Sequence, residues 1–161
     1  MTEEKAFQDY YSDEMSHCYG CGRLNEVGHQ IKSHWDGETS VCRYTPKPHH
    51  IAVPGYVYGG LIASLIDCHG TGTASAAAYK REGRPMGTEP ELRFVTASLS
   101  VDYLRPTPLG PPLELRGTVK ENKTRKVIVE IDLFADGEKC ARGRVVAVQA
   151  PKHLVEQIKG K

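Results

Sequence analysis

The chain has 161 residues, of which 25% are charged and 39% hydrophobic, and its formal net charge is +1. This size suits one domain with its own core, and the near-neutral charge gives no reason to expect a nucleic-acid partner or a charged membrane face. No apolar run approaches the ~20 residues that a bilayer span needs, and the acidic start "MTEEKAFQDYYSDEM" has no apolar signal region. The five cysteines, an odd number, favour reduced thiols, so we expect a cytoplasmic protein.

Residues 1–27 are predicted to form a lead-in that ends in the glycine-rich turn "CYGCG". The spacing of Cys18 and Cys21 raises the question of a metal site. Zinc sites usually take four ligands in two pairs, and no second Cys-x-x-Cys occurs in the chain. Cys42, Cys68 and His69 could complete a site only by chance of folding. We therefore expect a tight turn with small buried thiols and no metal.

Two strands are expected next, over 28–35 and 39–46, because "DGE" between them is a hairpin-turn signal. A proline-containing loop follows. From Gly59 to about Lys80, apolar residues recur near the helical period and no charged stripe is present, which predicts a helix buried on most faces. Asp67 is a carboxylate in the middle of this apolar pattern and needs an explanation.

Four further runs are typical of strands: 92–104, 113–121, 127–134 and 139–149. The turns "RPTPLGPP", "ENKTRK" and "ADGE" separate them and indicate an antiparallel meander. Strands, one buried helix and more strands make an α+β fold, in which a curved antiparallel sheet wraps round one long central helix. We assign this domain to residues 28–150 and leave 151–161 as a C-terminal tail.

Two stretches, "PGYVYGGLIASLID" and "VTASLSVDYLRPTPLG", together resemble the hotdog-fold acyl-CoA thioesterases of the phenylacetate-degradation (PaaI-like) type. In that family His-Gly-Gly opens the central helix, an acid follows nine residues after the His, and the partner strand reads Thr-Ala-x-Leu-x-x-x-Tyr-x-Arg-Pro. The matching positions here are Tyr58-Gly59-Gly60, Asp67, and the strand from Thr96 to Pro106. Tyr58 replaces the histidine, so an imidazole role is not carried over to that position.

The resemblance implies that the substrate is an acyl-CoA, that coenzyme A enters only as part of the substrate, and that no separate cofactor is needed. It also implies a homodimer, or a homotetramer built as a dimer of dimers. Thr96 is expected to hold the attacking water or the Asp67 carboxylate, since related enzymes use Ser or Thr there. His50 lies where related sequences often carry a polar side chain that faces the thioester.

Thioester hydrolysis needs hydrogen-bond donors for the developing oxyanion and either a general base or a nucleophile. A helix N-terminus supplies free backbone N–H groups and the positive end of the helix dipole. Gly59 and Gly60 lack a Cβ and let a ligand approach that end closely. We predict Gly60 N–H as the oxyanion donor, with Gly59 or Leu61 beside it.

Asp67 is predicted to be the base or the nucleophile. It lies seven residues after Gly60, about 10 Å along the helix axis, so one thioester carbonyl cannot touch both groups on a single helix. Two antiparallel helices side by side solve this problem, because the start of one then meets the acid of the other. The spacing therefore predicts a two-fold dimer with paired sites at the interface.

Coenzyme A phosphates need cations, and arginine suits them best. Arg105 follows a strand, whereas Lys120, Arg125 and Lys126 lie at a hairpin. Charge runs of this kind are as often solvated turns as phosphate sites.

Two alternatives stay open. "HHIAVPGYVYGG" also resembles the loop of hotdog hydroxyacyl-thioester dehydratases, in which His50 and Asp67 would act together, although the "TASLSVDYLRP" strand matches the thioesterases. A non-catalytic acyl-CoA-binding protein is the other alternative. The sequence does not identify the acyl group.

Overall fold

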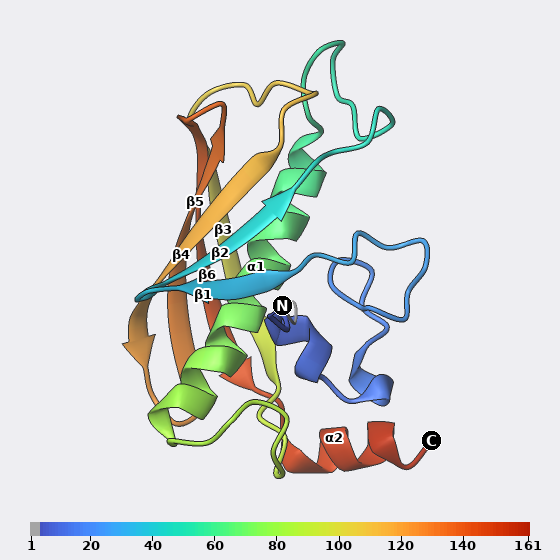
Figure 1. Ribbon diagram of the computed structural model, residues 1–161, viewed down its shortest axis with the longest axis vertical. Helices are drawn as coiled ribbons and strands as arrows, with labels where there is room; N and C mark the ends of the chain where they lie inside the picture. Colours follow the sequence, from blue (N-terminus) through green and yellow to red (C-terminus); the bar gives the residue numbers. More distant parts are fainter. Residues whose placement is uncertain (1–3) are drawn as a thin grey trace.

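The computed structural model describes residues 4–161 as a curved, six-stranded antiparallel sheet with a long helix against it (Figure 1). The helix is α1, Gly59–Arg81. The strands are β1 Ser33–Asp36, β2 Thr39–Tyr44, β3 Phe94–Tyr103, β4 Leu113–Asn122, β5 Lys126–Ala135 and β6 Glu138–Gln149. Two short 3-10 helices, η1 Phe7–Tyr10 and η2 Asp13–Met15, precede the sheet, and a second helix, α2 Lys152–Lys159, follows it. The predicted α+β architecture is confirmed.

The strand order is β1-β2-β4-β5-β6-β3, with every neighbouring pair antiparallel. Strands β4, β5 and β6 form the expected meander, but β3 pairs with β6 and lies at the sheet edge, so the prediction was wrong for that strand. The segment between β3 and β4 does not turn as a hairpin, because the loop before α1 holds it. Val57 N donates to Thr107 O at 2.9 Å, and Leu109 N donates to Gly55 O at 2.9 Å.

Burial of α1 against the sheet forms the core. Leu61, Ile62, Leu65 and Ile66 are each at most 3% exposed, and burial of such a side chain contributes about 1.5–3 kcal/mol. Gly143 of β6 allows the closest approach, since a Cβ there would lie 2.3 Å from Ile66 Cγ2. The helix is therefore fixed tightly against the sheet.

Residues 151–161, which the sequence left as a tail, include α2. Lys159 Nζ lies 2.9 Å from Glu91 Oε2 and 3.3 Å from Glu89 Oε1, which ties the helix to the segment before β3. The helix has only eight residues, too few for a clear periodic pattern. Among residues 4–161, neither α1 nor α2 has the length and apolar character to cross a bilayer.

His69 on α1 is completely buried and joins the helix to the first two strands. Its Nδ1 lies 2.9 Å from Ser33 Oγ, and its Nε2 lies 3.0 Å from Ser40 Oγ. Ser40 Oγ in turn lies 2.7 Å from Thr73 Oγ1. Burial lowers the pKa of His69 to about 4, so the imidazole is neutral in the folded protein at neutral pH.

We predict an acid-sensitive stability that depends on His69. The unfolded chain protonates this imidazole near pH 6.5, whereas the folded protein does so only near pH 4, so the unfolded state binds more protons in between. The free energy of unfolding should therefore fall by about 3 kcal/mol as the pH decreases through this window. Urea denaturation at several pH values measures the slope.

His69→Gln is the matched control, because glutamine keeps hydrogen-bonding capacity but does not titrate. The free energy of unfolding of this variant should fall less with decreasing pH than that of the wild type, by about 3 kcal/mol. An equal decline in both proteins would contradict the assignment.

Candidate active site

One narrow stripe of α1 stays open to solvent. Residues 68–79 of the helix are all buried. Nearer its start, the half-buried positions are Gly59, Gly60, Ala63, Ser64 and Asp67. All but the last are small, and Asp67 is the one carboxylate in α1. The stripe thus combines a glycine pair at the helix start with an acid two turns later.

Asp67 is held by the neighbouring edge strand. Thr96 Oγ1 of β3 donates a hydrogen bond to Asp67 Oδ1. The register of β3 against β6 shifts between Thr96 and Ser98. Such a bulge changes the direction in which the adjacent side chains point. The structure therefore brings the predicted acid and the predicted hydroxyl into contact.

The start of α1 has unused backbone donors. Tyr58 is the N-cap residue and makes no side-chain cap bond. Leu61 N donates to Tyr58 O at 3.1 Å, so this amide is occupied and is not available as the neighbouring donor. The N–H groups of Gly59 and Gly60 have no acceptor within residues 4–161. Free amides at a helix N-terminus favour an anionic or developing negative oxygen.

Two tyrosines flank the glycine pair. A Cβ on Gly60 would lie 2.4 Å from Cε1 of Tyr58, so the Tyr58 ring covers this residue. Tyr103 OH donates to Gly59 O at 2.7 Å and fixes the helix start to the end of β3. Tyr58 itself is largely exposed to solvent. The sequence did not single out Tyr103 for this contact, although it lies within the strand motif.

A pocket of about 550 Å³ opens beside this helix start. Its lining includes Tyr56, Gly59, Ile62, Tyr103 and Arg105. Arg105 Nη1 lies 2.5 Å from Glu138 Oε2, with both side chains more than half exposed. Arg105, which the sequence offered as a phosphate-binding cation at a strand end, thus lines the same pocket as Gly59.

The other predicted cations, Lys120, Arg125 and Lys126, lie elsewhere. They belong to the β4–β5 hairpin, which packs against the far end of α1, where Asn122 Nδ2 donates to Ala77 O at 3.2 Å. Ala77 is 17 residues after Gly60, about 26 Å along the helix. Within one protomer these cations do not join Arg105 at the pocket.

His50 bonds within its own loop. Lys47 N donates to His50 Nδ1 at 2.9 Å, and Tyr58 N donates to His50 O at 2.9 Å. Its ring lies 4.4 Å from that of His49 and 5.2 Å from that of His29, centroid to centroid. Burial, with the neighbouring imidazoles, lowers the pKa of His50. These contacts orient the ring within a cluster of imidazoles, and the bonds that it makes do not include Asp67.

Comparison with known proteins identifies the family. A model of the thioesterase superfamily matches residues 54–141, more than half of the chain. The chain belongs to the thioesterase superfamily. Its resemblance to the hotdog thioesterases and the predicted hotdog fold are thereby confirmed.

Relatives support this membership of the thioesterase superfamily. A crystal structure of a thioesterase superfamily protein from Shewanella loihica PV-4 is 52% identical, with a TM-score of 0.66, and covers 88% of this chain and 100% of that one. Acyl-coenzyme A thioesterase THEM4 from Xenopus laevis is 32% identical over 93 residues, 58% of this chain. The Rattus norvegicus THEM4 is 30% identical over 108 residues, 67% of this chain. The aligned parts make up only 36% and 41% of those two proteins.

Proposed function

We propose that this chain is an acyl-CoA thioesterase, which hydrolyses an acyl-CoA thioester to a carboxylic acid and free coenzyme A. The observation that carries the proposal is the position of Asp67, held by Thr96, on the same open stripe as the free amides of Gly59 and Gly60. Hydrolysis needs a general base or a nucleophile, which the Asp67 carboxylate would supply, and hydrogen-bond donors for the oxyanion. The relatives named acyl-coenzyme A thioesterase support the same chemistry.

The site is proposed to form between two copies of the chain, because Gly60 and Asp67 are about 10 Å apart along one helix. Strand β3 supports this arrangement: it is a sheet edge whose residues 95–100 are all exposed, including Val95 and Leu99. A long, exposed, apolar edge favours pairing with another strand. Pairing of two β3 edges would set two α1 stripes side by side, with small residues between them. Any tetramer would then be a dimer of such dimers.

In the proposed reaction, the thioester carbonyl oxygen accepts hydrogen bonds from Gly60 N–H and Gly59 N–H of one protomer. Those bonds stabilise the negative charge that develops on the oxygen. Asp67 of the partner subunit either attacks the carbonyl carbon or removes a proton from the water that attacks it. Thr96 holds that carboxylate or water. The C–S bond then breaks and coenzyme A leaves as its thiolate. Where water attacked, the carboxylic acid is released at once; where Asp67 attacked, a water then hydrolyses the acyl-Asp67 anhydride, which releases the acid and restores the carboxylate. No resident cofactor takes part.

Arg105, beside the pocket at the helix start, is proposed to bind a coenzyme A phosphate. Lys120, Arg125 and Lys126 would meet the nucleotide only across an interface between copies. The cysteines of the described chain are all free thiols, which supports a reducing, cytoplasmic location.

Asp67→Asn is expected to lower kcat for acyl-CoA hydrolysis by at least about 100-fold, because the amide can neither accept a proton nor attack the carbonyl. Thiol release over a panel of acyl-CoAs measures the loss and also identifies the acyl group. Asp136→Asn, at an exposed turn with a φ of 50°, is the control and should leave kcat unchanged. A folded Asp67→Asn protein with full turnover would contradict the role of Asp67 as base or nucleophile.

Crotonyl-CoA hydration, measured on the same samples, tests the dehydratase alternative. Saturable acyl-CoA binding by the wild-type protein with no thiol release would instead identify a non-catalytic binding protein.

Leu99→Lys is expected to break the dimer and to lower turnover with it, because a buried lysine at the β3 edge would lack a partner. Leu154→Lys on α2 is the matched control, since the two leucines are 38% and 39% exposed in the single chain. Sedimentation velocity and thiol release, measured at equal protein concentration, check both variants. A monomeric Leu99→Lys protein with undiminished turnover would contradict the shared site.

A further inference from the structure

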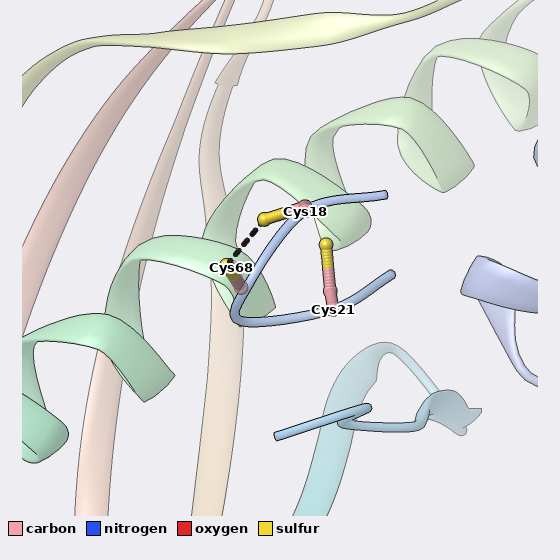
Figure 2. A group of neighbouring side chains, drawn as sticks. All are labelled: Cys18, Cys21 and Cys68. Carbon is pink, nitrogen blue, oxygen red and sulfur yellow. Dashed lines mark hydrogen bonds between the residues drawn. The ribbon is translucent and has the colours of Figure 1, made fainter. Parts of the chain in front are cut away.

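Three cysteines from two distant parts of the chain converge beside α1. Figure 2 shows Cys18 and Cys21 on the glycine-rich turn and Cys68 on the helix. Cys18 Sγ lies 3.7 Å from Cys68 Sγ, and all three sulfurs lie within 4.8 Å of one another. The sequence suggested no metal site, because only the fold brings Cys68 to the Cys-x-x-Cys turn.

We propose that Cys18, Cys21 and Cys68 bind one zinc ion, which clamps the N-terminal segment to the helix that carries Asp67. Zinc binds cysteine sulfur at about 2.3 Å in a tetrahedral arrangement, which places the sulfurs about 3.8 Å apart. The distance between Cys18 and Cys68 already matches this tetrahedral edge. Three protein ligands leave the fourth position for water, and Cys18 is only half-buried, so solvent reaches this side of the cluster.

The backbone of the turn is shaped for this contact. A Cβ on Gly20 would lie 2.4 Å from Cys68 Sγ, so only glycine lets the turn lie directly on the helix. Gly22 N donates to Cys18 O at 2.7 Å, which closes the turn and fixes both of its cysteines. Cys21 and Cys68 are 2% and 7% exposed. The sulfurs are thus held together by packing before any ion binds.

The charge near the cluster also favours bound thiolates. The Arg93 guanidinium lies against Cys21 and stacks on the Tyr11 ring, 4.2 Å from its centroid. Arg93 Nη1 is buried without a hydrogen-bond partner among the residues described. A buried cationic nitrogen with no acceptor is costly. Zinc with three thiolates carries a net charge of −1, which this guanidinium would neutralise.

The proposed ion holds the turn against the helix and does not act on the thioester. Cys68 is buried beneath the turn, whereas the preceding residue, Asp67, faces the open stripe. Successive helical residues point about 100° apart, so the two side chains leave the helix on different faces. The ion would therefore fix the part of α1 from which Asp67 projects, without contacting the substrate.

Cobalt titration of the reduced, metal-free wild-type protein tests the site directly. Tetrahedral Co²⁺ with thiolate ligands gives visible d–d bands and a thiolate-to-cobalt charge-transfer band, and zinc should displace both. We expect roughly one ion per chain. Cys18→Ala and Cys21→Ala should each lose most of the charge-transfer band and weaken binding at least about tenfold.

Cys140→Ala is the matched control, because Cys140 on β6 is 1% exposed and lies outside the cluster. It should keep the bands and the affinity. A reduced wild-type protein that gives no cobalt bands and retains no zinc after gel filtration would overturn the proposal, and this measurement needs no variant to fold. A disulfide between two of the three cysteines, in a protein that binds no metal when reduced, would overturn it too. Neither result depends on thioesterase activity.

Discussion

The burial of α1 in the curved sheet is the constraint on which the rest of the structure depends. The close contact between Ile66 and Gly143 fixes the sheet against one side of the helix, and the N-terminal segment lies against another side at Cys68 and Gly72. Residues 68–79 are therefore all buried. Before the exposed last two residues, Lys80 and Arg81, only the stripe from Gly59 to Asp67 stays open. Because a helix is rigid, the distance between the two ends of that stripe is fixed, and a small substrate group cannot span it on one chain. The proposed need for a second copy follows from this distance.

Some polar groups of the molecule are buried and hydrogen-bonded to one another, whereas others have no partner in the part of the chain that the structure describes. His69, Ser33, Ser40 and Thr73 are buried and bonded to one another, as interior polar groups must be. Within residues 4–161 the amides of Gly59 and Gly60 have no hydrogen-bond partner, and an acid interrupts an apolar helix. Unpartnered amides and a carboxylate within an apolar helix lower the local stability, and they are expected where a ligand supplies the missing interactions. Arg93, beside the three thiols, is similar, because its buried Nη1 has no hydrogen-bond partner within residues 4–161. The proposed hydrolysis does not use this part of the molecule.

Local patterns in the sequence predicted the elements well. Helical periodicity placed α1 within one residue of its observed end, and alternation with turn signals placed β4, β5 and β6. The Gly60, Asp67 and Thr96 grouping came from motif and spacing together. Features that depend on contacts between distant residues were not predictable. Strand β3 pairs with β6 because the loop before α1 holds the segment that follows β3. Cys68 meets Cys18 only in the folded chain. The separation of Arg105 from the hairpin cations likewise depends on which end of α1 each segment contacts.

Mixing two inactive variants tests the shared site most directly. Asp67→Asn removes the acid, and Gly60→Val blocks the helix start, so each variant alone should be inactive. If each site takes Gly60 from one protomer and Asp67 from the other, a mixed dimer contains one intact site. Subunit exchange at equal concentrations should then restore about a quarter of the wild-type thiol release, because half of the dimers are mixed and half of their sites are intact. A mixture no more active than its two separate components would contradict the shared site.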